Sequence, residues 1–312
     1  MRYNELGDTG ISVSQLSFGA SSLGGVFHEV DDQEAVRAVH EALDAGINYI
    51  DVSPAYGATR AESVLGRALQ GVSRDRYAIS TKVGKYTSSS AYGNDTFDYS
   101  GRRVRASVQE SMQRVGVDYF DMVYLHDFDY QNHAHADSAL SEGYEALAAL
   151  KREGWIGGVG AGIYDMALWK RVLLETDMDA LLVHNHHCLN DIRLHELLPL
   201  ARQKGVGIVN ASPFGSGLLT DRGAPDWHPA TPQQRERFRK AAGLCRDHGT
   251  SIAKLAVQFS TQHPDIPTTL FSSASPDSVQ RTLEWYGEPC DYELVAKVQR
   301  VLEPVMNLQW DY

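Results

Sequence analysis

The sequence contains few cysteines, and it lacks both a long apolar run and a cationic start. The three cysteines, Cys188, Cys245 and Cys290, are odd in number and far apart, so they predict neither a disulfide framework nor a CxxC metal pair. No run approaches the ~18 apolar residues of a membrane span. The first ten residues, MRYNELGDTG, do not resemble a secretory signal. We therefore expect a reduced, cytoplasmic, soluble protein.

Positive charge is also scarce. Lys and Arg number 29 against 40 Asp and Glu, which gives a formal net charge of −11. This balance argues against nucleic acid or an anionic membrane as partner, because both select clustered cations. Hydrophobic residues make up 43% of the 312 residues, a globular proportion, and no low-complexity linker divides the chain. We expect one domain over residues 1–312 that binds a small molecule.

Short apolar runs alternate with longer amphipathic segments along the whole chain. Eight runs have the length and composition of buried strands: 15–19, 47–51, 77–82, 119–126, 156–160, 180–183, 206–210 and 268–271. Five of the segments between them are predicted to be helices that stop at a glycine. The last four of these helices cover residues 103–115, 141–152, 193–203 and 238–247. The first of the five runs from residue 31 to the glycine at position 46.

Eight strand–helix units predict a (β/α)8 barrel of the TIM type. The surplus length fits an N-terminal hairpin, an insertion near residues 215–234 and a tail after Pro304. The alternative is an open doubly wound sheet, which would carry a GxGxxG turn after its first strand. The first turn here, residues 18–25, reads FGASSLGG and does not fit that pattern.

Polar residues end three successive predicted strands. Asp51, Lys82 and His126 hold these positions, and Tyr56 follows Asp51 in a Ser-Pro-Ala-Tyr-Gly turn. Each has an ordinary structural explanation, as a helix cap, a solvated end or a packed ring. Because the carboxyl ends of barrel strands meet at one mouth, we expect the four to converge.

The four groups suit proton transfer at an oxygen bound to carbon. A free phenol has a pKa near 10, and an adjacent ammonium such as Lys82 is expected to lower it. Asp51 would hold Lys82 charged, and His126 would donate a hydrogen bond to the substrate oxygen. No nucleophile is paired with a base, so a bound hydride carrier is the natural missing partner.

With these residues in these positions, the sequence resembles the aldo-keto reductase superfamily over essentially its whole length. The motifs are LGDTGISVS, GINYIDVSPAYG, STKVG, DYFD followed by LH, and ASPFGSGLL. The resemblance implies that Asp51, Tyr56, Lys82 and His126 form the family's catalytic tetrad. It also implies a monomer or small homo-oligomer with a nicotinamide cofactor across the barrel mouth. Local sequence, including PDWHPA and LEPVMNLQW, is most similar to the L-galactose and L-fucose (D-threo-aldose) 1-dehydrogenase branch.

The resemblance also implies a set of cofactor contacts, with departures. The family's Ser-Asn pair after the fifth strand is missing, and Ala211 replaces a stacking tyrosine. The predicted cofactor contacts are Asn185, Ser212, Phe214, Gly215, Ser216, Gly217, Leu218, Ser272, Ser273, Ser275 and Arg281.

The residues after the eighth predicted strand bear on the choice between NAD and NADP. The stretch from Ser272 to Ser278 holds hydroxyls and the carboxylate of Asp277, with no cation before Arg281. A ribose 2′-phosphate attracts Lys or Arg, whereas a free 2′-hydroxyl suits hydroxyls and carboxylates. We therefore expect NAD rather than NADP. The alternative is that Arg281 folds back or that another loop supplies a cation.

We expect the substrate to be a sugar, held by Tyr56 and His126 together with side chains suited to sugar faces and hydroxyls: Tyr86, Phe128, His187 and Trp310. The histidine-rich run 184–188 could suggest a metal, but no acidic companion stands at a known spacing, and we predict none. Glycines 157, 158, 160 and 162 predict a strand that lets cofactor or substrate approach.

The predicted reaction is NAD-dependent oxidation of the C1 hydroxyl of an aldose, such as L-galactose or L-fucose, to the lactone. The alternatives are a pyridoxal 4-dehydrogenase or a general aldehyde or ketone reductase of the same superfamily. A cofactor-sensing subunit without activity is disfavoured, because such proteins can lose tetrad members and all four are present here.

Overall fold

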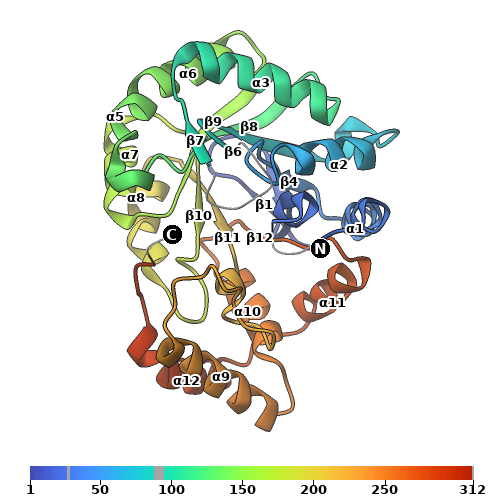
Figure 1. The fold of residues 1–312 in the computed structure, drawn as a ribbon, viewed down its shortest axis with the longest axis vertical. Helices are drawn as coiled ribbons and strands as arrows, with labels where there is room; N and C mark the ends of the chain where they lie inside the picture. The colour runs from blue at the N-terminus through green and yellow to red at the C-terminus, as the bar shows by residue number, and fades with distance from the viewer. Residues whose placement is uncertain (27–28, 88–94, 311–312) are drawn as a thin grey trace.

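The computed structural model describes residues 1–26, 29–87 and 95–310. Eight parallel strands form a closed barrel in which each strand pairs with its neighbour in the chain order, and the last pairs with the first (Figure 1). They are β3 (Leu16–Gly19), β4 (Tyr49–Asp51), β5 (Ala78–Val83), β8 (Phe120–His126), β9 (Ile156–Ile163), β10 (Ala180–His184), β11 (Gly207–Ala211) and β12 (Thr268–Phe271). All eight predicted strands are therefore confirmed, and so is the (β/α)8 barrel.

Helices surround the barrel on its outside (Figure 1). Those that follow the barrel strands are α1 (Asp32–Asp44), α2 (Arg60–Leu69), α3 (Gly101–Val115), α6 (Tyr144–Arg152), α7 (Met166–Glu175), α8 (Leu198–Gln203), α10 (Ile252–Thr261) and α11 (Pro276–Tyr286). Two more, α9 (Pro232–Asp247) and α12 (Tyr292–Leu302), and the short α4 (Tyr130–His133) and α5 (Ala136–Ser138) are additions. None of the helices in the described ranges is both long and apolar enough to span a bilayer.

Three predicted helix boundaries need correction. Helix α9 begins at Pro232 rather than 238, because Thr231 and Gln234 form a capping box around a proline that suits the first helical turn. Helix α6 begins at Tyr144 after a π-helical turn over Ala139–Gly143. The predicted helix 193–203 is a 3₁₀ turn, Arg193–Glu196, followed by α8, which restarts with a proline in its first turn.

The predicted N-terminal hairpin closes the amino end of the barrel. Strands β1 (Tyr3–Glu5) and β2 (Ser12–Ser14) pair antiparallel. Leu6 and Val13 are fully buried with the side chains that fill the barrel interior. A second hairpin, β6 (Lys85–Thr87) with β7 (Asp95–Phe97), follows β5 at the opposite end. The β1–β2 hairpin therefore covers the amino end of the barrel and leaves the site to the carboxyl end.

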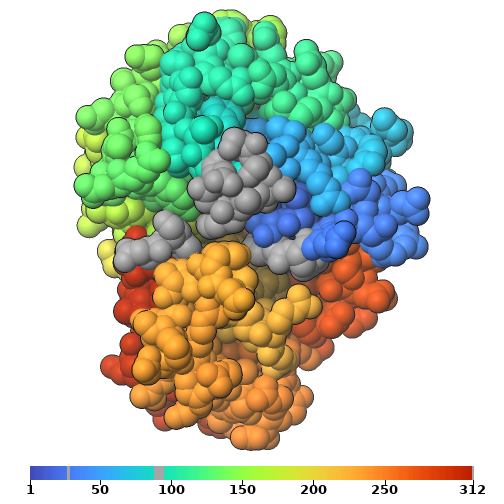
Figure 2. All heavy atoms as spheres, viewed as in Figure 1, coloured from blue at the N-terminus to red at the C-terminus, as the bar shows by residue number. Residues whose placement is uncertain are grey.

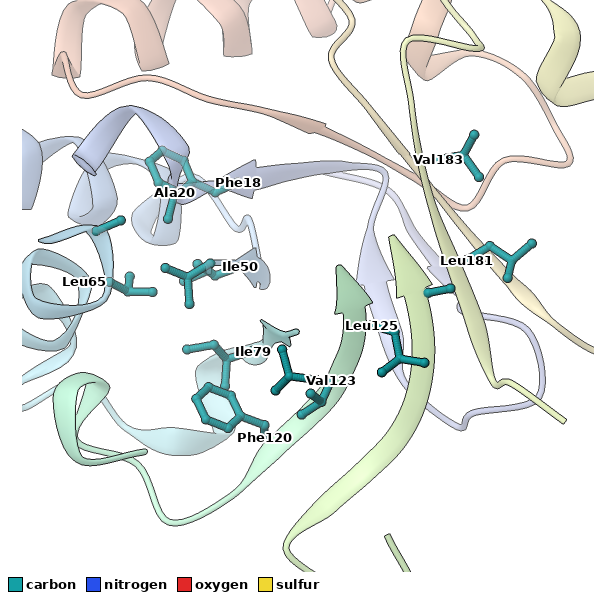
Figure 3. Packing of buried hydrophobic residues seen from close by; sticks show 14 of the residues in the cluster. Phe18, Ala20, Ile50, Leu65, Ile79, Phe120, Val123, Leu125, Leu181 and Val183 are labelled. Carbon is teal, nitrogen blue, oxygen red and sulfur yellow. The ribbon is translucent and has the colours of Figure 1, made fainter. Parts of the chain in front are cut away.

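Apolar packing holds the strands to the helices. In Figure 3, Leu65 of α2 points toward Ile50 of β4, and Val123 of β8 lies near Ile79 of β5. Each such side chain is fully or almost fully buried, and full burial contributes about 1.5–3 kcal/mol per residue. A rigid barrel of this kind fixes the positions of groups at its strand ends.

The glycines of β9 have a different purpose from the one predicted. A Cβ at residue 158 would lie 2.4 Å from the sulfur of Met122, and one at residue 160 would lie 2.4 Å from the ring of Tyr124. Both neighbours belong to β8 and fill the barrel interior. The glycines therefore make room for packing, and only Gly162 lines the cavity described next.

Candidate active site

A cavity of about 1010 Å³ lies at the carboxyl ends of the barrel strands. Each of the eight strands contributes one of its last two residues to the lining: Gly19, Asp51, Lys82, His126, Gly162, His184, Ala211 and Phe271. In Figure 2 the segment between β11 and α9, together with α9, forms the yellow and orange part of the surface. Residues of that segment complete the cavity lining. This is the place where TIM barrels carry their active sites.

Asp51 and Lys82 form a buried ion pair at the floor of the cavity. Lys82 Nζ donates to Asp51 Oδ2 and, over 3.1 Å, to the carbonyl of Val52. Ser80 Oγ donates to the other Asp51 oxygen over 2.8 Å. Burial alone lowers the pKa of Lys82, but Asp51 and the phenol of Tyr56 raise it above its ordinary value. Lys82 is therefore a permanent positive charge inside the site.

Tyr56 lies beside this charge. Lys82 Nζ is 4.8 Å from the centre of the Tyr56 ring. Burial raises the pKa of Tyr56 above 10, while Lys82 lowers it and Asp51 raises it again. The expected cation is in place, but the prediction of a lowered pKa is wrong for the protein by itself, because desolvation of the phenolate outweighs the ammonium.

His126 faces Tyr56 across the cavity. The two ring centres are 6.0 Å apart and the rings are nearly perpendicular. Burial lowers the pKa of His126 to about 3, so the imidazole is neutral near pH 7. Its Nδ1 lies 3.2 Å from Ser53 Oγ, and its Nε2 lies 3.6 Å from Asp127 Oδ2. The four predicted tetrad residues thus line one cavity, as the motif requires.

A second set of buried charges, which sequence analysis missed, lines the cavity next to His126. Lys85 Nζ lies 2.7 Å from Asp127 Oδ2 and 3.2 Å from Asp95 Oδ2. The same ammonium is 4.2 Å from the centre of the Tyr130 ring. Although burial raises the pKa of Asp127, His126 and Lys85 bring it well below the ordinary value. We call Lys85, Asp95 and Asp127 the charged wall.

The sequence contains a usable signal for this wall. Asp127 directly follows His126, and Lys85 stands three residues after Lys82. Both therefore emerge at strand ends beside tetrad residues, where a barrel places its functional groups. Asp95 could not be found in this way, because it reaches Lys85 only through the β6–β7 hairpin, in which Asp95 pairs with Thr87.

Nine of the eleven predicted cofactor contacts line the cavity: Asn185, Ser212, Phe214, Ser216, Gly217, Ser272, Ser273, Ser275 and Arg281. Asn185 Nδ2 donates to Ser216 Oγ over 3.0 Å, which ties the strand β10 end to the long loop after β11. The other two, Gly215 and Leu218, do not line it. Leu218 is buried in an apolar cluster with Leu219, so its side chain serves packing. Gly215 is buried within a 3₁₀ turn.

Two predicted substrate contacts belong to the packed loops around the mouth instead. The phenol oxygen of Tyr86 accepts the amide of Gly84 over 3.1 Å, and its ring packs under the guanidinium of Arg103. Phe128 is fully buried, edge-on to Tyr99. Neither lines the cavity, because the Tyr86 ring packs against Arg103 of α3 and the Phe128 ring packs against Tyr99.

The other two also lie away from the cavity. His187 is buried and stacks on Phe259, with ring centres 4.9 Å apart. Trp310 is buried against His228, and its amide donates to the Tyr164 hydroxyl over 2.9 Å. Both side chains therefore fix loops around the site and do not line it.

The histidine-rich run also departs from the expected strand. Strand β10 ends at His184, and Asn185 has a φ of 63°, which turns the chain. His184 lines the cavity, whereas His186 Nε2 lies 2.5 Å from the carbonyl of Tyr164 and its Nδ1 lies 3.2 Å from Asp191. The two histidines therefore do not share a face. Within the described residues no three His, Cys, Asp or Glu side chains are grouped to hold a metal.

Comparison with known proteins agrees with this geometry. The chain matches the aldo/keto reductase family over residues 15–303. It is 38% identical to the L-galactose dehydrogenase of Arabidopsis thaliana, over 98% of this chain and 95% of that protein. It is 29% identical to a D-threo-aldose 1-dehydrogenase of a Pseudomonas species, over 88% and 90%.

A solved structure shows the same architecture. It is the holo form of an aldo-keto reductase from Bacillus halodurans, with a TM-score of 0.80 and 25% identity, covering 100% of this chain and 98% of that one. Together with the tetrad at the mouth of an eight-stranded barrel, these matches show that the chain belongs to the aldo/keto reductase family.

Proposed function

We propose that the protein oxidises the C1 hydroxyl of an aldose to the lactone, with NAD as the hydride acceptor. The observation that carries the proposal is the convergence of Asp51, Tyr56, Lys82 and His126 on one cavity. The names of the relatives, an L-galactose dehydrogenase and an aldose 1-dehydrogenase, support an aldose as the substrate.

The cavity fits a nicotinamide cofactor, which aldo-keto reductases use. Hydroxyls of Ser272, Ser273 and Ser275 and the guanidinium groups of Arg222 and Arg281 line the part formed by the loops after β11 and β12. These donors match the pyrophosphate and ribose groups of a dinucleotide. Asn185, Ser212 and Ser216, in the segments that follow β10 and β11, line the same cavity and would hold the nicotinamide end. When bound, the nicotinamide accepts the hydride that leaves C1.

The protein itself must accept the proton that the C1 hydroxyl loses. Tyr56 would take the proton of the C1 hydroxyl, and Lys82 would stabilise the resulting charge distribution at the phenol. Because burial raises the pKa of Tyr56, oxidation is expected to speed up as pH rises above neutrality. His126, neutral near pH 7, would donate a hydrogen bond to the reacting oxygen.

The charged wall supports a hydroxyl-rich substrate. Asp127 Oδ2 lies 3.6 Å from His126 Nε2, the atom that would meet the reacting oxygen. A substrate atom that bonds to Asp127 must therefore lie close to that oxygen, as a hydroxyl on the neighbouring carbon does. A carboxylate accepts such a hydroxyl well, and a plain aldehyde would leave it without that partner.

The preference for NAD rests on groups different from those first expected. Asp277 does not line the cavity, whereas Arg281 does. Three carboxylates from the start of α1 and the residues before it, Glu29, Asp31 and Glu34, line the same cavity, and α1 packs beside α11, which carries Arg281 (Figure 1). Carboxylates accept hydrogen bonds from a free ribose and repel a 2′-phosphate.

A substrate panel with NAD tests the proposal. L-galactose, L-fucose, D-arabinose and pyridoxal would be oxidised with NAD or NADP, and 4-nitrobenzaldehyde would be reduced with NADH or NADPH. All rates would be followed by the absorbance of the reduced cofactor. The proposal predicts the highest kcat/KM for an aldose with NAD. If pyridoxal or the aromatic aldehyde exceeds every aldose, the protein is instead a pyridoxal dehydrogenase or a general reductase.

A further inference from the structure

We propose that Ser53 is a positioning residue that selects the tautomer of His126. Ser53 Oγ lies 3.2 Å from His126 Nδ1, and both residues are buried. The inference deepens the proposed function and rests on it in one respect, namely that His126 meets the reacting oxygen.

The Ser53 hydroxyl has two hydrogen-bond neighbours. Ser53 Oγ accepts the amide N–H of Ala55 over 3.1 Å. Its second neighbour is His126 Nδ1. Ser53 is fully buried, so its own proton has no access to bulk water. Because a buried hydroxyl proton needs an acceptor, the Ser53 hydroxyl donates to Nδ1.

This assignment fixes the other ring nitrogen. Nδ1 can accept only when it carries no proton, and a neutral imidazole then carries its proton on Nε2. His126 is neutral near pH 7 because it is buried. The ring lines the cavity, and Nε2 is the nitrogen that lies beside Asp127. The result is an N–H donor facing the substrate side.

The opposite tautomer would oppose the reaction. It would aim the lone pair of Nε2 at the reacting oxygen and would leave the Ser53 proton without an acceptor. The carboxylate of Asp127, 3.6 Å from Nε2, also favours a proton on that nitrogen. Lys85 offsets that carboxylate, so the ring is not driven to take a second proton.

The same turn positions both acid–base groups. The amide of Tyr56 donates to the carbonyl of Ser53 over 3.1 Å, while the amide of Ala55 donates to the Ser53 hydroxyl. One short turn therefore carries the Tyr56 phenol and holds the His126 ring. The tautomer is set by the element that also fixes the distance between the two groups.

Nitrogen NMR of the intact protein tests the assignment directly. Protein labelled with ¹⁵N-histidine would be studied near pH 7, and the His126 signals would be identified by their loss in His126→Gln. In wild type we expect an unprotonated Nδ1 and a protonated Nε2. In Ser53→Ala we expect signals that move toward a mixture of tautomers, and in Ser53→Thr, which keeps the hydroxyl, a return to the wild-type pattern.

Kinetics provides a second measurement. Loss of one hydrogen bond between neutral groups should lower kcat/KM for Ser53→Ala about 2- to 12-fold, with partial or full rescue in Ser53→Thr. Ser63→Ala is the matched control, because Ser63 is an exposed serine on α2 whose hydroxyl bonds only to the helix backbone. Its spectrum and rates should match wild type. Any substrate that turns over can be used, including 4-nitrobenzaldehyde with reduced cofactor.

Two results would overturn the inference: a proton on Nδ1 in wild type, or a His126 spectrum that is the same in Ser53→Ala. Failure of the proposed function is distinguishable. If no aldose is oxidised but the spectrum shows the Nε2 proton and responds to Ser53→Ala, the tautomer assignment stands and the substrate assignment falls.

Discussion

Replacement of Asp127 by asparagine isolates the role of the charged wall. Asp127 has a backbone φ of 52°, and asparagine is among the few residues that adopt this left-handed conformation readily. The substitution therefore removes a charge with little backbone strain. Lys85 keeps Asp95 as a partner at 3.2 Å, so no buried ammonium is left alone. The tetrad residues are unchanged.

The size of the effect follows from one hydrogen bond. A bond from a substrate hydroxyl to the Asp127 carboxylate is of the charge-assisted kind, with a net contribution of about 1.5–3 kcal/mol. Asparagine retains an oxygen acceptor without the charge, so we expect the loss of roughly half or more of that range. At about 1.4 kcal/mol per factor of ten, the expected decrease in kcat/KM is about 3- to 140-fold.

The assay compares substrates that differ by one hydroxyl. With reduced cofactor, the ratio of kcat/KM for lactaldehyde to that for propanal reports the hydroxyl next to the reacting carbon. The ratio should fall in Asp127→Asn and stay at the wild-type value in Asp137→Asn, since the Asp137 side chain is 90% exposed and pairs with Arg171. A ratio in Asp127→Asn equal to that of wild type would refute the hypothesis that Asp127 accepts a substrate hydroxyl.

Three further predictions concern the proton, the cofactor and stability. Tyr56→Phe should lower kcat by about 10²- to 10⁴-fold while cofactor binding, followed by fluorescence titration, persists, and turnover near the wild-type rate would exclude the phenol as the proton acceptor. Arg281→Ser should raise KM for NADP about tenfold or more and KM for NAD much less, because Arg281 lines the same cavity as the serines after β12 and carries the charge that a 2′-phosphate would attract. Equal changes for the two cofactors would remove Arg281 from phosphate discrimination. Burial, and after it the negative charge of Asp127, raises the pKa of Asp129 from 3.8 to about 6. The contribution of Asp129 to the free energy of unfolding is therefore present below pH 4 and is lost as pH rises through about 6. Urea unfolding between pH 4 and 7 should show this loss in wild type and a flatter profile in Asp129→Asn, and parallel profiles would contradict it.

Local pattern was sufficient for the framework because the pattern is itself the cause. A strand buried on both faces must be a continuous apolar run, and helix-ending glycines such as Gly116 take the left-handed conformation that other residues resist. The runs therefore located all eight strands. Helix starts were less secure, as at Pro232, because capping depends on side-chain bonds between neighbours rather than on periodicity.

The aromatic contacts show where pattern fails. Phe128 and Trp310 stand in loops next to the mouth, and composition alone could not tell whether their rings face the cavity or the packed loops. In the structure both rings are buried against other side chains and do not face the cavity, because burying a large ring among apolar neighbours is favourable. Leu218, predicted to contact the cofactor, is likewise buried in an apolar cluster.

The order of apolar runs and helical segments was enough to predict the barrel and the residues at its strand ends, including Asp51, Lys82 and His126. Eight strand–helix units without a GxGxxG turn favour a closed barrel, and the carboxyl ends of barrel strands meet at one mouth. The direction of the Tyr56 pKa shift and the partners of Lys85 and Ser53 come from the folded chain. These depend on burial and on distances of a few ångströms between residues far apart in the chain, which no local pattern encodes.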